Sequence, residues 1–293
     1  MVSVTIGICA YNEEQNIRRC LDSILSQDGV DLSEILVVCS GCTDSTEDIV
    51  SEISQSHPEV RLLSQAHREG KNSAINLCLS QANSEVFVLV NADNTLERDA
   101  LQNLVRPFQD SQIGMVGGHP VPVNSADDYV GFAVHMLWDM HHRLSLLYPK
   151  VGELVAFRIP LPPLPTSMQS DEDIIRMSLE RRGLKTVYAS DAIVYNKGPT
   201  TVADFVKQRT RVNIGERYMK RKYDFDIPTW NKALLFSAYC SFVKDHRGSA
   251  SKMLVAMALE VYSRIYAMLH VLLDRGDQKV WSQVASTKDV DMN

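Results

Sequence analysis

The first hundred residues alternate between short apolar runs and segments with helical spacing. Each apolar run is too short for an ordinary helix and predicts a buried strand. The runs are Val2–Ala10, Ile35–Cys39, Val60–Leu63 and Val86–Val90. Between the first two, apolar side chains recur at helical spacing from Ile17 to Leu25, as in a helix that lays one face on a sheet. This alternation predicts an α/β fold with a mostly parallel sheet and helices on both faces.

Three of these strands end in polar or small residues, at 11–13, 40–41 and 91–93. Because ligands bind outside the carboxyl ends of the strands in an open α/β sheet, these ends predict a nucleotide site at one edge. Asp93 would stand at that edge, where its carboxylate could hold a divalent cation and so neutralise a phosphate. The alternative is that Asp93 only caps the following helix, the role that Asn12 is expected to play after the first strand.

Several classes of protein are disfavoured. No Gly-x-Gly-x-x-Gly follows the first strand, which argues against a dehydrogenase, and no Walker-type phosphate loop occurs. The formal net charge of -6 argues against non-specific nucleic-acid binding. The six cysteines, in a chain whose first strand begins at once, predict reduced thiols in a cytoplasmic protein. Cys39 and Cys42 have no second pair for zinc and no thioredoxin-like setting.

The second half adds apolar runs at 113–118, 152–158 and 187–195, which we expect to be strands. Helical spacing covers His135–Leu147 and Ile174–Arg182, and Gly183 suits the end of the latter helix. Asp171, Glu172 and Asp173 precede this helix, where acids can simply complement the helix dipole.

Three histidines within eight residues suggest a metal site at first sight. His135 and His142 would lie about two turns apart, however, while His141 points elsewhere, so they form no single ligand set. We expect satisfied or solvent-facing histidines, with an acceptor contact at His142 as the alternative.

The C-terminal third combines a basic segment with two apolar ones. Seven lysines and arginines face one acid, Glu216, between Lys207 and Lys222, a local patch suited to a diphosphate or to anionic lipid head groups. Apolar segments follow at Ala233–Val243 and Met253–Leu273. They predict a helical hairpin that packs on its own domain, pairs two subunits as a homodimer or lies at a membrane surface. A transmembrane span is the least favoured reading, because charged residues interrupt the longer segment.

Four short motifs carry a resemblance that none of them would carry alone. They are Ala10-Tyr11-Asn12-Glu13-Glu14, Ser40-Gly41-Cys42-Thr43-Asp44, Gly70-Lys71 with Ala74-Ile75-Asn76, and Asn91-Ala92-Asp93. In this order and spacing they resemble the family 2 glycosyltransferases, which have a GT-A fold, over roughly residues 2–215.

The resemblance implies a set of donor contacts. Ala10, Tyr11 and Glu13 would line the base and ribose, and Asp93 would be the metal-binding end of the Asp-x-Asp motif, with Mn²⁺ or Mg²⁺ as the cofactor. The expected nucleotide-sugar-binding set is completed by Ser40, Lys71 and Asn91. Two residues depart from the family pattern. Asn91 replaces the first Asp of the motif, and Cys39 replaces an acid that reads the nucleobase in many members.

The resemblance also places the acceptor machinery. Counting back from Gly183 puts Glu172 at the position of the acceptor-activating base, with Asp171 beside it and Asp173 as a third alternative. Gln208 and Arg211 resemble the Gln-x-x-Arg-Trp motif, with Val212 in place of Trp, and would lie near the diphosphate or the acceptor. Glu153, on the strand that backs the acceptor pocket in the family, and His142 join that group.

The resulting expectation is an inverting, metal-dependent glycosyltransferase acting on a nucleotide-diphosphate sugar, with a UDP-sugar favoured. Its acceptor would be a hydroxyl or lipid phosphate, with peripheral contact at the inner membrane face. Residues 1–118 would bind the donor, 119–225 would form the acceptor-binding and catalytic half of the same domain, and 226–293 would hold the apolar helices and tail. The alternative is a non-catalytic module that docks through its basic patch and hairpin.

Overall fold

The computed structural model describes residues 2–167, 170–225, 227–273 and 284–288. Within this part, the chain forms two compact units. The first takes the chain up to Pro120 together with Val151–Asn196. The second takes Val121–Lys150 and the described residues from Lys197 onward. Each unit has its own apolar core.

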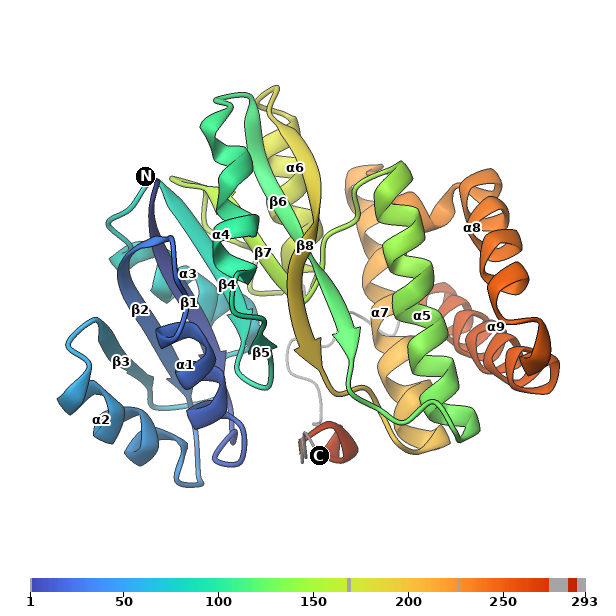
Figure 1. Ribbon diagram of the computed structural model, residues 1–293, viewed down its shortest axis with the longest axis horizontal. Coiled ribbons are helices and arrows are strands. Elements are labelled where there is room, and N and C mark those ends of the chain that lie inside the picture. The colour runs from blue at the N-terminus through green and yellow to red at the C-terminus, as the bar shows by residue number, and fades with distance from the viewer. Residues whose placement is uncertain (1, 168–169, 226, 274–283, 289–293) are drawn as a thin grey trace. The chain divides into compact units, whose positions relative to one another are not determined.

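The first unit is organised around a sheet with the strand order β3-β2-β1-β4-β7-β6-β8-β5 (Figure 1). The strands are β1 Ser3–Ala10, β2 Asp31–Ser40, β3 Val60–Gln65, β4 Val86–Asn91, β5 Thr95–Leu96, β6 Ile113–Pro122, β7 Leu154–Arg158 and β8 Lys185–Asn196. The pairs β1–β2, β1–β4 and β2–β3 are parallel. The pairs β4–β7, β6–β7 and β5–β8 are antiparallel. The predicted α/β class is confirmed, and the parallel pairs are those among β1 to β4, within the first hundred residues.

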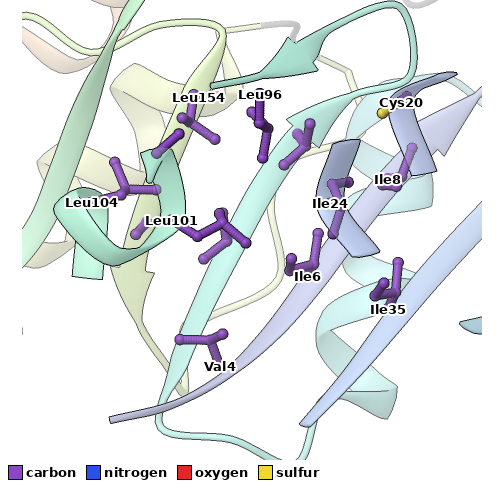
Figure 2. Close-up of a cluster of buried hydrophobic side chains, with 14 of the residues drawn as sticks. Val4, Ile6, Ile8, Cys20, Ile24, Ile35, Leu96, Leu101, Leu104 and Leu154 are labelled. Carbon is purple, nitrogen blue, oxygen red and sulfur yellow. The ribbon is translucent and has the colours of Figure 1, made fainter. Parts of the chain in front are cut away.

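Helices cover both faces of this sheet. They are α1 Ile17–Leu25, α2 Thr46–Ser56, α3 Lys71–Gln81, α4 Ala100–Val105, a 3-10 turn at Arg106–Gln109 and α6 Asp171–Glu180. Side chains from α1 and α4 meet β1 in one buried cluster that includes Ile6, Ile24 and Leu104 (Figure 2). The thiol of Cys78 on α3 contacts the Leu36 carbonyl on β2, on the opposite face. Burial of each helix's apolar stripe is what fixes it on the sheet.

The expectation that Asn12 caps the first helix is wrong. Asn12 has a left-handed backbone with φ 53°, and α1 begins only after Asn16. The Asn12 side chain instead accepts from the backbone N–H of Thr43 at 2.8 Å and donates to the Thr43 hydroxyl at 3.0 Å. It therefore ties the loop after β1 to the loop after β2, a long-range contact that local sequence does not encode.

The second unit is helical. Its helices are α5 Tyr129–Leu147, α7 Val202–Tyr223, α8 Lys232–Asp245 and α9 Ala250–Leu272, with 3-10 turns at Pro228–Trp230, Arg247–Ser249 and Ala285–Thr287. Phe132, Phe205, Phe242 and Met253 bring these four helices into one apolar core. The predicted C-terminal apolar helices are confirmed as α8 and α9. Among the described helices, α9 alone is long and apolar enough to cross a membrane, a weak indication, and 17% of its most apolar window is buried.

Candidate active site

The carboxyl ends of four parallel strands form one edge of the first unit. β1 ends at Ala10, β2 at Ser40 and β4 at Asn91, while the loop after β3 leads to Lys71 at the start of α3. Parallel pairing places these ends side by side, as the sequence predicted. The residues proposed for nucleotide-sugar binding are therefore gathered at one edge, and their roles there remain proposals.

Tyr11 at this edge is covered by an arginine. The guanidinium carbon of Arg68 lies 3.8 Å from the centre of the Tyr11 ring. The loop carrying Arg68 is held by Ser40, whose hydroxyl accepts from the Glu69 N–H at 3.2 Å and contacts the His67 carbonyl at 3.4 Å. Sequence reasoning did not single out Arg68, and only its position just before Gly70-Lys71 could have indicated it.

Gly41 allows this loop to approach. It has φ 66°, and a Cβ there would lie 2.5 Å from the backbone nitrogen of Arg68, so no larger residue fits. Cys39, two residues before Gly41 on β2, is fully buried. A hydrogen bond with Cys42, together with burial, holds the pKa of the Cys39 thiol well above its usual value. The Cys39 thiol is therefore neutral. It stands at the position where the family 2 pattern often has an acid.

Glu13 is buried at the same edge. Its carboxylate accepts from the Asn16 side chain at 3.1 Å, and its backbone N–H donates to the Thr46 hydroxyl at 2.8 Å. These contacts fix the turn between β1 and α1. The predicted contact of Glu13 with a ribose remains a proposal.

Asp93 lies in the turn between β4, which ends at Asn91, and β5, which begins at Thr95, and Glu153 stands just before β7. The Asn91 amide donates to Oε2 of Glu153 at 2.7 Å, and the Asn94 amide donates to the same oxygen at 3.3 Å. Burial first, and then the charge of Asp93, raise the pKa of Glu153, while Asn91 and Lys71 oppose the rise. Asp93 and Glu153 therefore lie near enough to interact electrostatically.

Lys71 joins the start of α3 to the start of α6. Its Nζ lies 2.7 Å from Oδ2 of Asp171 and 3.5 Å from Oε1 of Glu172. The Asp171 side chain is 3% exposed, whereas that of Glu172 is 24% exposed. Of the two carboxylates, Glu172 is therefore the one that an acceptor can reach.

The charges of this group differ. Burial and the charge of Glu172 raise the pKa of Asp171 to about 7. Burial would also raise the pKa of Glu172, but the Lys71 ammonium and a backbone N–H hold it below its usual value. The two carboxylates likewise hold the pKa of Lys71 above its usual value, against the effect of burial. Near neutral pH, Glu172 is ionised beside an ammonium, while Asp171 retains part of its proton.

Helix α3 also holds the proline-rich loop before α6. The Asn76 amide donates to the Leu164 carbonyl at 2.9 Å, and its oxygen accepts from the Leu164 N–H at 2.7 Å. One turn earlier, the Asn72 amide donates to the Pro165 carbonyl at 2.8 Å. Asn72 was missed from the sequence, although its spacing of four from Asn76 puts both on one helix face.

The acids at this edge differ from the ligand set of a closed metal site. Within the described part of the chain, no three His, Cys, Asp or Glu side chains gather as a set that could hold a metal ion. Mg²⁺-like cations, however, take oxygen ligands, keep several waters and are often held by one or two carboxylates plus substrate phosphates. Asp93, with Glu153 near it, fits that kind of site, whereas a closed structural metal site does not fit.

The remaining predicted residues lie in the second unit. His135 Nε2 contacts the Asn124 carbonyl at 2.7 Å, and the His141 ring meets Trp138 edge-on, so these two histidines are structural. His142 is on α5, and Gln208 and Arg211 are on α7. Their parts in diphosphate or acceptor binding remain predictions.

One residue of the predicted basic patch is internal. Arg209 on α7 donates to both oxygens of Glu260 on α9, at 2.8 and 3.1 Å, and Glu260 also accepts from Arg264 at 2.7 Å. Glu260 and Arg264 are four residues apart, so that pair lies within α9. The expectation that Arg209 belongs to a patch suited to a diphosphate or to lipid head groups is wrong, because α9 supplies the acid that pairs with it.

Comparison with known proteins decides the family. Residues 5–160 match the family described as glycosyl transferase family 2. The chain belongs to this family. A Mycobacterium tuberculosis protein, named uncharacterized protein MT1568, is 38% identical over 112 residues, which are 38% of this chain and 34% of that protein. The matches cover between 11% and 38% of the length of the curated relatives.

Solved structures of glycosyltransferases share the fold of this family 2 chain. The mannosyltransferase PcManGT of Pyrobaculum calidifontis, in complex with GDP-Man and Mn²⁺, has a TM-score of 0.68 at 22% identity, over 93% of this chain and 87% of that one. Residues 1–349 of S. aureus TarS, in complex with UDP, give a TM-score of 0.53 at 16% identity, over 97% and 95% of the two chains. The protein is thus a family 2 glycosyltransferase with a GT-A fold.

Proposed function

We propose that this enzyme is an inverting, metal-dependent glycosyltransferase that moves a sugar from a nucleotide-diphosphate donor to an acceptor hydroxyl. The observation that carries the proposal is the contact of Lys71 with Asp171 and Glu172. A partly buried ammonium held between two acids, at the edge where we propose that the nucleotide binds, is the kind of perturbed charge cluster found at catalytic sites. A module that only docked on a partner would have no need of it.

Glu172 is the proposed base. The acceptor hydroxyl gives its proton to the Glu172 carboxylate while its oxygen attacks the anomeric carbon of the donor sugar. The bond from that carbon to the diphosphate oxygen breaks, and its electron pair leaves with the nucleoside diphosphate. Since attack comes from the face opposite the leaving group, the anomer is inverted. Lys71 keeps Glu172 ionised and so ready to accept the proton.

Asp93 is the proposed protein ligand of Mn²⁺ or Mg²⁺. When bound, the cation would offset the charge of the departing diphosphate. The Mn²⁺ in the mannosyltransferase complex supports a divalent cation, although it says nothing of which ion this chain prefers. If the acceptor were itself a lipid phosphate, its oxygen would already be ionised and Glu172 would matter less.

The donor is proposed to be a UDP-sugar, the expectation that the family resemblance favoured. The UDP complex of TarS supports this choice, and the GDP-Man complex of the mannosyltransferase supports the alternative. Cys39, being buried and neutral, adds no charge that would select between the two bases.

A nucleotide-sugar panel tests the proposal directly. Binding of UDP- and GDP-sugars would be measured by calorimetry, and their slow hydrolysis by release of the nucleoside diphosphate, each with and without Mn²⁺. We expect Mn²⁺-dependent binding and hydrolysis with a UDP-sugar. Tighter binding of GDP than of UDP would reverse the donor assignment, and the absence of both binding and hydrolysis across the panel would contradict the enzyme itself.

We also propose peripheral contact with an anionic membrane, through one face of α9. Six large apolar side chains spaced three or four residues apart are exposed there: Leu254, Met257, Val261, Ile265, Met268 and Leu272. The C-terminal end of this stripe is flanked by positive charge, because Arg221 of α7 lies 3.5 Å from the Val271 carbonyl and Lys222 beside it is exposed. An apolar face bordered by cations suits anionic lipid better than it suits a second copy of the same positively charged surface.

A further inference from the structure

β4 ends in Asn91, an amide at the position where the family motif has an acid. An acid, Glu153, lies beside it, just before the neighbouring strand β7. The antiparallel register pairs Val90 with Leu154, so one step further Asn91 stands opposite Glu153. The Asn91 amide nitrogen lies 2.7 Å from Oε2 of Glu153. A carboxylate therefore stands beside residue 91 although residue 91 is not itself acidic.

A second residue points to the same place. Asn94 is 1% exposed and donates from its amide nitrogen to the Glu153 carboxylate at 3.3 Å. The other end of this amide, Oδ1, is inaccessible to solvent and has no hydrogen-bond partner among the described residues. A buried amide oxygen without a partner costs free energy unless a ligand or water meets it. Asn94 Oδ1, next to Glu153 and one residue from Asp93, therefore points to a ligand at this corner.

The two amides have a clear effect on Glu153. Both amides donate to Oε2 and so hold the carboxylate in one orientation. Neither amide bonds to the other oxygen, Oε1. An aspartate at position 91 would instead place two carboxylates in direct contact, which is unfavourable. Asn91 and Glu153 are therefore matched to each other.

We propose that Glu153, in the turn just before β7, supplies the second carboxylate that the Asn91-Ala92-Asp93 sequence lacks. Together with Asp93 it would face a divalent cation carried by the nucleoside diphosphate, while Asn91 and Asn94 act as positioning residues for Glu153. The inference rests on the proposed metal-dependent donor binding. The two carboxylates of the site would then come from two separate segments of the chain, after β4 and before β7. This arrangement still offers a divalent cation the carboxylate oxygens that it prefers.

The test measures metal-dependent nucleotide binding and not turnover. UDP would be titrated by calorimetry into the full-length protein with and without Mn²⁺, and the gain in affinity due to Mn²⁺ would be compared between variants. Glu153→Gln keeps the shape and an acceptor oxygen but removes the charge. The double variant Asn91→Asp with Glu153→Gln returns a charge to position 91. Glu85→Gln is the matched control, because Glu85 precedes the opposite end of β4 and is exposed.

We expect Glu153→Gln to reduce the Mn²⁺-dependent gain at least about tenfold, as is usual when residues around a metal are altered. Metal-free UDP affinity and the melting temperature should stay close to wild type, and the double variant should recover most of the gain. Glu85→Gln should bind as wild type does. A full gain in folded Glu153→Gln would overturn the inference while leaving metal dependence intact, and so would a double variant that recovers nothing. If wild type itself shows no gain, the proposed metal dependence fails, and the inference fails with it.

Discussion

Lys71 Nζ lies 2.7 Å from Oδ2 of Asp171, and this contact joins the first turns of two helices that are far apart in the sequence. The same ammonium lowers the pKa of Glu172, so a residue of the donor half controls the proposed base of the acceptor half.

Replacing Lys71 with Met should therefore impair the reaction most strongly at low pH. Lys71 lowers the pKa of Glu172, so its loss raises that pKa, and Glu172 becomes protonated and inactive at a higher pH than in wild type. The acidic limb of the kcat profile should move upward, whereas Lys71→Arg should largely restore it. Lys185→Met, which alters an exposed lysine of the same unit, is the control. An unmoved acidic limb would show that Lys71 does not act through Glu172.

The base assignment predicts a ranking of three neutral variants. Glu172→Gln should lower kcat by roughly a hundredfold or more, the usual scale for loss of a general base, with nucleotide affinity near wild type. Asp171→Asn should do less, and Asp173→Asn least. The measurement is kcat together with calorimetric binding of the nucleoside diphosphate.

Two outcomes would contradict that ranking in different ways. An inactive Asp173→Asn beside an active Glu172→Gln would move the base by one residue. Full activity of all three would indicate an acceptor that carries its own ionised nucleophile, such as a lipid phosphate, and would exclude general-base catalysis.

Asp93→Ala should abolish the Mn²⁺-dependent part of donor binding while the fold survives, because only an oxygen ligand is removed. Calorimetric titrations with and without Mn²⁺ and a thermal melt make the comparison. Asp99→Ala, in the turn before α4, serves as a matched acid nearby in sequence. Donor affinity that still responds fully to Mn²⁺ would refute the metal role of Asp93.

Asp171 should make the protein less stable as the pH rises from about 4 to about 7. Its pKa is about 7 in the folded protein against an ordinary value of 3.8, so in this window the unfolded chain has lost a proton that the folded protein keeps. Loss of that proton favours the unfolded state as the pH rises, and the penalty is complete above about 7. Asn resembles the protonated form and titrates in neither state.

The melting temperature of Asp171→Asn relative to wild type should accordingly rise between pH 4 and pH 7. Asp191→Asn, an exposed acid on β8, should show no such trend. A difference between Asp171→Asn and wild type that stays constant with pH would mean that Asp171 is ionised throughout.

The α9 face should bring part of the protein down with anionic liposomes at low salt, and added salt should release it, since the flanking positive charges would be screened. Val261→Asp with Ile265→Asp should abolish sedimentation by placing charge on the apolar stripe. Val202→Asp, at an exposed position at the start of α7, is the control. Protein that stays in the supernatant at low salt would refute membrane contact, and a dimer in analytical ultracentrifugation that the double variant disrupts would assign the face to a second subunit.

The sequence by itself determined the elements and the edge at which they converge. Short apolar runs such as Val86–Val90 can satisfy their backbone and bury both faces only inside a sheet, and parallel strands place their carboxyl ends together whatever the details. The positions of Lys71 and Asp93 at that edge follow from this rule, whereas Glu172 reaches it through the loop that follows the antiparallel strand β7. The family motifs added roles that spacing alone leaves open.

Only the tertiary structure decided which side chains are partners. Asn12 binds Thr43 instead of capping a helix, Arg209 is paired with Glu260 instead of facing solvent, and the carboxylate of Glu153 stands beside Asn91. In each case the partner comes from a different element. Local sequence fixes backbone conformation over a few residues, whereas a charge or an amide takes its function from whatever the packed chain brings to within 3 Å.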